Sequence, residues 1–292
     1  LQVTFTGSLL GTVEVDNPAI VDMLSPSSSR GTRGAPGTLK PDVAAPGQTI
    51  ISANVGSGNG GSSSNGTSMA SPHVAGIAAL LRSKYPTWSV EQIKAAIMNT
   101  AGHDLYSEPN KGGDRYGPNR VGAGRVNANS AATTQVLAYS TSDPGVVSAG
   151  FGVVEAPITS STVTRTKSIQ LRNVGSSART VSLSYSPVVA QPGVSYSVSP
   201  TSVRIPGKGT KTVKVTMTIK PSKLRRTIDP TMSTTTVSSW TGEGARQYVS
   251  DASGRLLVKP SGQSALRVPA VSYTHLRAHE TDSYLVCRLL LE

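Results

Sequence analysis

The segment 69–81 constrains the fold most strongly, because it contains no Asp, Glu, Lys or Arg over about three and a half helical turns. Several of its side chains are small, namely Ala70, Ala75, Gly76, Ala78 and Ala79. A helix that is apolar or small on every side is normally buried, and this one is shorter than the roughly 20 residues that cross a bilayer. Pro72 is tolerated only in a first turn, which places the helix start near Ser68. The sequence therefore predicts a buried core helix over about 68–84.

A second helix is predicted over 89–101, where the start signals are clear. Ser89 and Gln92 have the spacing of a capping box, in which each side chain satisfies a backbone N–H of the other residue. The apolar residues Val90, Ile93 and Ile97 form one stripe. An amphipathic helix of this kind is expected on the outside of the same domain as the first helix.

Residues 151–271 show strand and turn signals without a helix. The segment 210–220 alternates strictly, with four apolar residues on one face: Val213, Val215, Met217 and Ile219. Segments 168–172 and 180–185 repeat this period of two. The predicted fold is therefore an α/β unit over 1–135, a linker over 136–150, and an all-β sandwich over 151–271.

The charge balance is basic, with 28 Lys and Arg against 16 Asp and Glu in 292 residues. A basic chain can bind nucleic acid, but these cations alternate with apolar residues along strands, and aromatic residues for base stacking make up only 4%. We therefore expect a solvated basic surface and no nucleic-acid partner. No apolar run approaches the length of a membrane span, and Cys287 is the single cysteine, so a disulfide within the chain is excluded. No signal peptide is visible at Leu1, and the sequence does not predict an oligomeric state.

The tail 272–292 differs from both units and holds His275, His279 and Cys287. It follows a segment that already reads as a closing strand, and it resembles a translated sequencing-adapter read-through. The interpretation favoured is a non-native tail, and the alternative is an amphipathic C-terminal helix. A metal site is disfavoured, because no second cluster of ligands occurs elsewhere.

The stretch "NGTSMASPHVAG" at 65–76 carries the functional signal. From local chemistry alone, Ser68 reads as the N-cap region of an ordinary buried helix. The stretch nevertheless resembles, nearly residue for residue, the nucleophile segment of the subtilisin-like serine peptidases. "LKPDVAAPG" at 39–47 and "GAGRVNANSA" at 122–131 resemble neighbouring segments of that family. The resemblance covers about 17–135 and implies the C-terminal part of a parallel-sheet catalytic domain.

This resemblance implies roles for four residues. Ser68 would be the nucleophile of an acyl-enzyme mechanism, with its backbone N–H as an oxyanion donor. Thr67 would support the same oxyanion hole, Met69 would flank the serine, and Asn65 would line the leaving-group side. His73 is not implied as the base, because five residues along a helix it projects away from Ser68, so we expect a buried structural histidine. The family further implies protein or peptide substrates and a secreted or cell-surface location. No cofactor is identifiable, and calcium is implied by the family only.

The other catalytic groups of this family are missing. Its triad runs Asp, His, Ser along the chain, but no histidine precedes Ser68. The Asp and His segments and the oxyanion Asn are therefore expected upstream of Leu1, and this chain alone is expected to be inactive. Residues 150–270 resemble the fibronectin type III-like domain of larger family members, which agrees with truncation. The alternative function is a non-catalytic β-sandwich interaction or cell-surface module that carries a protease remnant.

Overall fold

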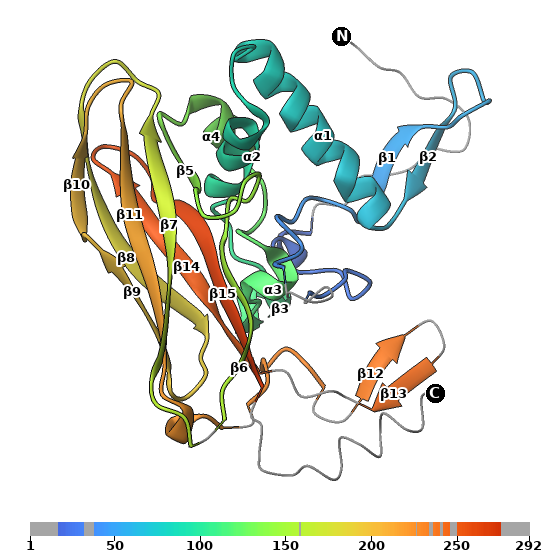
Figure 1. Cartoon of the computed structure of the whole chain (residues 1–292). Helices are drawn as coiled ribbons and strands as arrows, with labels where there is room; N and C mark the ends of the chain where they lie inside the picture. The colour runs from blue at the N-terminus through green and yellow to red at the C-terminus, as the bar shows by residue number, and fades with distance from the viewer. Residues whose placement is uncertain are drawn as a thin grey trace.

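The computed structural model describes residues 17–31, 38–157, 159–225, 227–233, 236–239, 242–245 and 250–275. Four α-helices are present in this part: α1 (Thr67–Lys84), α2 (Val90–Asn99), α3 (Pro118–Val121) and α4 (Ala128–Thr133). They lie on one side of two larger β-sheets (Figure 1). None of the helices among the described residues has the length and apolarity required to cross a membrane.

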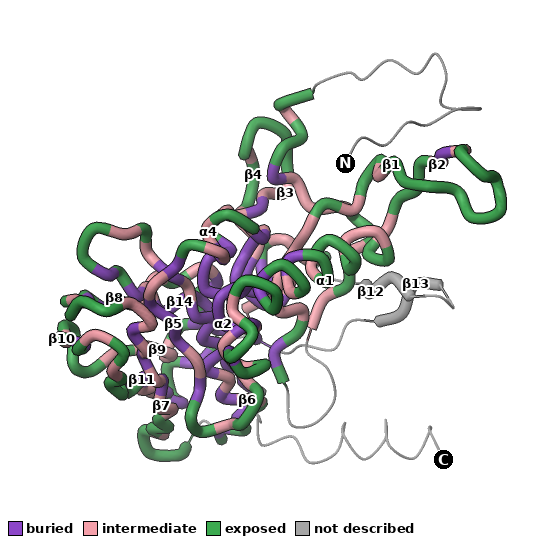
Figure 2. Tube along the Cα trace, turned by 90° about the horizontal axis from the view of Figure 1, so that it is seen from above, coloured by how far each residue is buried: buried purple, intermediate pink, exposed green. Residues whose placement is uncertain are grey.

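Both predicted helices form, but their burial is the reverse of the expectation. In α1 only Ile77 and Leu81 are buried, Leu80 is 65% exposed, and most of the helix is drawn as exposed (Figure 2). One stripe of α1 packs on α2 and α4, and no described element covers its other face. The prediction of an all-round buried helix is therefore wrong for this structure, and so is that of a buried His73, which is exposed.

Helix α2 is the better buried of the two, because it packs between α1 and strand β5 (Val136–Ser140). Its capping box is present as predicted: Gln92 N–H donates to Ser89 Oγ at 3.3 Å, and Ser89 N–H donates to Gln92 Oε1 at 2.9 Å. The expected stripe holds at Ile93 and Ile97, which are buried, and fails at Val90, which is 68% exposed.

Two short antiparallel hairpins accompany the helices, one before α1 and one between α2 and α3. The first is β1 (Ile50–Ala53) with β2 (Gly61–Ser64), and the second is β3 (Tyr106–Glu108) with β4 (Gly112–Arg115). Two 3₁₀ turns, η2 (Pro18–Ile20) and η3 (Pro109–Lys111), accompany them. The parallel pairing within described residues 17–135 consists of isolated bridges, Met23 to Tyr106 and Ala44 to Arg125. The described part of this unit therefore contains mixed, short pairings.

Two larger sheets make up the rest of the described chain. The four-stranded sheet has the order β5–β7–β11–β9, with β7 (Val163–Asn173), β11 (Thr210–Ile219) and β9 (Val194–Ser199). The five-stranded sheet has the order β10–β8–β14–β15–β6, with β10 (Ser202–Ile205), β8 (Arg179–Val189), β14 (Ser250–Pro260), β15 (Leu266–His275) and β6 (Ala149–Glu155). Their neighbours are antiparallel except for β15 and β6, which pair in parallel. The turn η4 (Pro221–Lys223) and the hairpin β12 (Thr236–Ser239) with β13 (Gly242–Ala245) follow β11.

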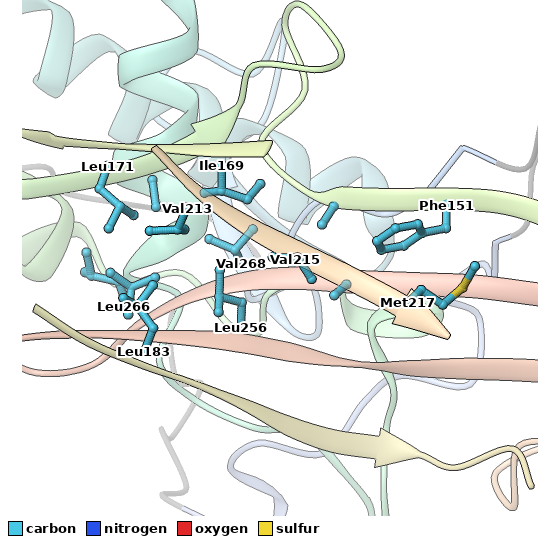
Figure 3. Close-up of a cluster of buried hydrophobic side chains, with 14 of the residues drawn as sticks. Phe151, Ile169, Leu171, Leu183, Val213, Val215, Met217, Leu256, Leu266 and Val268 are labelled. Atoms are coloured by element: carbon cyan, nitrogen blue, oxygen red, sulfur yellow. The ribbon is translucent and has the colours of Figure 1, made fainter. Parts of the chain in front are cut away.

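The two sheets share one hydrophobic core. The apolar face predicted for 210–220 is buried, since Val213, Val215, Met217 and Ile219 are each at most 1% exposed. These side chains meet Leu256, Val268 and Leu183 from the other sheet (Figure 3). The period of two in this segment therefore predicted both the strand and its inward face.

Residues 136–150 differ from the predicted linker, because they contain β5 and the start of β6. Val136 and Ala138 belong to the core between the sheets, whereas Leu137 belongs to the core around the helices. At the C-terminal end, β15 continues past the predicted boundary to His275, with Ser272 and Thr274 buried. Tail residues 276–292, including His279 and Cys287, lie outside the described residues.

The amide of Asn99 connects α2 to both sheets. This fully buried side chain accepts a hydrogen bond from Ala138 N–H at 2.7 Å and donates to the Arg267 carbonyl at 3.1 Å. Ala138 lies in β5 and Arg267 in β15. A buried amide with both ends satisfied specifies one arrangement of its neighbours, because any other arrangement leaves it unpaired.

Candidate active site

Two glycines, Gly47 and Gly66, form the backbone contact at which α1 begins. Gly66 is the N-cap with a φ of 141°, a conformation that favours glycine, and its N–H donates to the Gly47 carbonyl at 2.7 Å. A Cβ on Gly47 would lie 2.6 Å from the Gly66 oxygen. The close backbone contact between segments 38–48 and 65–67 therefore requires glycine at position 47, and it fixes where the helix begins.

Ser68 is the second residue of α1 and is exposed. The N–H groups of Met69 and Ala70 donate to the Gly66 carbonyl at 3.0 and 3.3 Å, whereas Ser68 N–H has no acceptor among the described residues. It is one of the free donors at a helix N-terminus, where the helix dipole favours negative charge. An anionic oxygen near this turn would thus meet a free N–H and a favourable potential.

The other residues predicted for the site lie around this turn. Asn65 is held by a hydrogen bond from Thr49 N–H to its Oδ1. Thr67 is exposed and Met69 is half-buried. His73 lies one turn further along and its Nδ1 is 2.9 Å from the Met69 carbonyl oxygen, so its ring is engaged away from Ser68.

A general base for Ser68 is absent from the described part of the chain, where no side chain hydrogen-bonds to its hydroxyl. The one described histidine–carboxylate pair is His103 with Asp22, at 3.7 Å. Asp22 is buried and its main partner is Arg125, at 2.6 Å. This arrangement reads as an ion-paired anchor beside β3, and no described hydrogen bond links it to Ser68. Within the described residues, nothing is placed to accept the proton of the Ser68 hydroxyl.

An open cavity of about 1010 Å³ lies against the inner side of this helix end. The N-cap Gly66 and the α1 residues Thr67, Ala70, Ser71 and Val74 line it, together with parts of segments 20–31 and 40–48; Ser68 does not line it. The wall formed by 25–31 is fixed by arginines that the sequence analysis did not single out. Arg120 donates to the carbonyls of Ser28 and Pro26, and Arg30 pairs with buried Asp229 at 2.6 Å.

Asp229 comes from the segment after β11, about 200 residues from Arg30 along the chain, and spacing in the sequence gave no signal for this pair. It is almost fully buried and also accepts hydrogen bonds from the N–H and hydroxyl of Thr231. A carboxylate satisfied in this way is an anchor for Arg30. Within the described residues, no group of three or more His, Cys, Asp or Glu side chains could hold a metal ion.

Comparisons with known proteins agree on this region. The model described as Subtilase family matches residues 8–124. The Minor extracellular protease Vpr of Bacillus subtilis (strain 168) is 36% identical over 206 residues, which cover 68% of this chain and 24% of that protein. Subtilisin-like protease SBT1.2 of Arabidopsis thaliana is 38% identical over 141 residues, 43% of this chain and 17% of that protein. Subtilisin-like protease SBT3.16 of the same plant is 51% identical over 75 residues, 25% of this chain and 10% of that protein.

The chain thus spans a quarter or less of the length of these relatives. The alignment with Vpr, at 68% of the chain, is longer than residues 1–135 and so extends into the strands that follow. Among solved structures, the CooA pilin subunit from enterotoxigenic Escherichia coli matches 50% of this chain and 100% of its own, at 12% identity and a TM-score of 0.29. A likeness at that score supports no argument about the fold.

Proposed function

Because the chain belongs to the subtilase family, we propose that it is part of a serine endopeptidase whose nucleophile is Ser68. The observation that carries this proposal is the position of Ser68 at the exposed first turn of α1, with a free backbone N–H. Attack of Ser68 Oγ on a peptide carbonyl forms an acyl-enzyme and places negative charge on the carbonyl oxygen. The free N–H and the helix dipole stabilise that charge.

The neighbouring residues support this chemistry in distinct ways. Thr67 lies next to the free backbone N–H of Ser68, and Met69 flanks Ser68 on the other side in the chain. The hydrogen bond from Thr49 N–H orients the Asn65 side chain, which we place on the leaving-group side. Proton removal from Ser68 requires a base, which is typically worth about 10²–10⁴-fold in rate. The described residues supply none, so we expect the Asp, His and oxyanion Asn to come from a preceding segment.

We also propose how the parts of the chain relate to the enzyme. Residues up to about 135 would form the C-terminal part of the α/β catalytic domain, and the two larger sheets would correspond to a fibronectin type III-like β-sandwich. The printed name of one relative describes an extracellular protease, so we propose that this protein is also exported and cleaves proteins or peptides. The exposed face of α1 supports the proposal that the catalytic domain is larger than the described residues, because a helix with so many small residues is normally covered.

A chimera tests the proposal. The part of Bacillus subtilis Vpr that precedes its aligned region is joined to this chain, and cleavage of casein and of a peptide nitroanilide is measured. We expect turnover that Ser68→Ala abolishes and that Ser83→Ala, at an exposed serine near the other end of α1, retains. The chain by itself is expected to show no more hydrolysis than its Ser68→Ala variant.

One result would argue against the enzyme, and another would contradict the expectation that the chain alone is inactive. A soluble chimera that unfolds cooperatively yet has no Ser68-dependent turnover would favour the alternative, a non-catalytic interaction module that carries a protease remnant. Serine-dependent turnover by the unmodified chain would show that a base exists within these 292 residues.

A further inference from the structure

A cluster of three arginines and one carboxylate lies where the helical region meets the sheets. Asp104 Oδ1 lies 3.0 Å from Arg255 Nη1 and 2.8 Å from Arg267 Nη1, and Asp104 Oδ2 lies 3.2 Å from Arg115 Nη1. Arg255 is in β14, Arg267 in β15 and Arg115 in β4. No second carboxylate of the described residues forms a salt bridge with any of these arginines. The cluster therefore carries two positive charges in excess.

Arg255 is the member of this cluster whose hydrogen-bonding capacity is least satisfied. It is 3% exposed, its Nη1 faces Asp104, and its Nε and Nη2 are buried without any partner. The other two arginines have further acceptors or solvent: Arg267 also donates to the Ala123 carbonyl at 3.4 Å, and Arg115 donates to the Pro187 carbonyl at 3.1 Å. A buried donor without an acceptor costs about 1–3 kcal/mol, and more when it is charged.

The two free atoms of Arg255 are adjacent on the guanidinium plane. Nε–H and one N–H of Nη2 point the same way along one edge, the geometry with which arginine binds carboxylate, sulfate or phosphate through two parallel hydrogen bonds. The electrostatics of the site agree with this geometry. Burial lowers the pKa of Arg255 to about 10. The positive charges of Arg267 and Arg115 also lower this pKa, whereas the negative charge of Asp104 raises it. An anion on this edge would relieve both penalties.

We propose that the junction of the helical region and the sheets binds one small inorganic oxyanion on the Nε–Nη2 edge of Arg255. The anion completes the second edge of a guanidinium whose first edge is held by Asp104, and it neutralises part of the excess charge. Since Asp104 and Arg115 come from the helical region and Arg255 and Arg267 from the sheets, the bound anion strengthens the contact between the two. This site is separate from Ser68 and does not depend on protease activity.

The test uses the full chain with sodium sulfate and sodium phosphate as probes. Titration calorimetry should show one saturable site for each, and none for chloride at equal ionic strength. Unfolding is then followed with and without sulfate. At a sulfate concentration ten times its dissociation constant, the unfolding equilibrium constant should fall about tenfold.

Sulfate also stabilises proteins in general by exclusion from their surface, so matched variants separate the two effects. Arg255→Lys keeps the positive charge and removes the two-donor edge, and it should lose the calorimetric signal and the saturable part of the stabilisation. Arg204→Lys, the same exchange at an exposed arginine of β10, should keep both. An equal sulfate response in Arg255→Lys and the unmodified chain overturns the proposal. If Arg255→Lys does not fold, the absence of saturable sulfate or phosphate binding to the unmodified chain overturns it directly.

Discussion

Replacing Asp251 by Asn should abolish most of the change in the free energy of unfolding between pH 4 and pH 8. Asp251 lies in β14, is 3% exposed, and accepts one hydrogen bond, from Ser253 Oγ at 3.1 Å, while its Oδ1 has no partner. Burial, followed by the nearby charge of Asp229, raises the pKa of Asp251 from 3.8 to about 8. Other titratable or charged groups that act on this cluster are Arg30, Arg255, Tyr185, Tyr196 and Tyr273.

The sign follows from proton binding in the two states. Between pH 4 and pH 8 the folded chain holds a proton on Asp251 that the unfolded chain releases, so the free energy of unfolding falls as the pH rises. The stabilisation is complete below the unfolded pKa and is lost as the pH approaches the folded one. At about 1.4 kcal/mol per pH unit, the loss between pH 4 and pH 7 is about 4 kcal/mol, a large part of the 5–15 kcal/mol that is typical for a domain.

The measurement is urea unfolding followed by far-UV circular dichroism from pH 4.5 to pH 8. A carboxamide resembles the protonated carboxyl in shape and carries no charge, so Asp251→Asn should match the unmodified chain at the acid end and exceed it by about 4 kcal/mol near pH 7. Asp143→Asn, at a partly exposed carboxylate paired with Lys167, serves as control and should keep the original slope. Equal slopes for the unmodified chain and Asp251→Asn would refute the reasoning.

Two matched pairs test the packing around α1 and the backbone near the cavity. Leu81→Ala, at a side chain 1% exposed, should lower the free energy of unfolding by about 2–5 kcal/mol, whereas Leu80→Ala, 65% exposed, should change it by less than about 0.5 kcal/mol in urea titrations. Gly122→Ala would place a Cβ 2.0 Å from the Asp42 carbonyl oxygen at a φ of 57° and should prevent stable folding, whereas Gly145→Ala, with a φ of 74° and open space, should cost only about 1–2 kcal/mol in thermal unfolding. A Leu80 effect as large as that of Leu81, or equal effects at the two glycines, would contradict these contacts.

Sequence patterns predicted the elements whose signal is local. The capping box of Ser89 and Gln92 placed the start of α2, and the alternation from Val213 to Ile219 placed both the strand and its buried face. In each case the signal is a contact between near neighbours or a periodicity of the strand itself. The same holds for Ser68, since its position at the helix start follows from Pro72 one turn later.

Burial that depends on distant segments was harder to predict. The composition of α1 fits a covered helix, yet the described elements cover only one stripe of it. Strand β5 was not predicted from the sequence for a different reason. Val136 and Ala138 face one hydrophobic core and Leu137 faces the other, so no polar residue alternates with them. A short apolar run of this kind has no period of two. The pairs Arg30–Asp229 and Arg255–Asp104 join residues far apart in the chain, and no sequence spacing indicates them.

Strand β5 also limits how this protein can be divided. Because one strand supplies side chains to both hydrophobic cores, and Asn99 fastens it to α2, the helices and the sheets have no flexible joint between them. A cut before β5 would take Leu137 and the partner of the Asn99 amide away from the helices, and a cut after β5 would strip an edge strand from the four-stranded sheet. Exchange of one part for its counterpart from a related protein would therefore have to carry β5 and its partners on both sides, so the two parts are expected to evolve together and to resist recombination as separate modules.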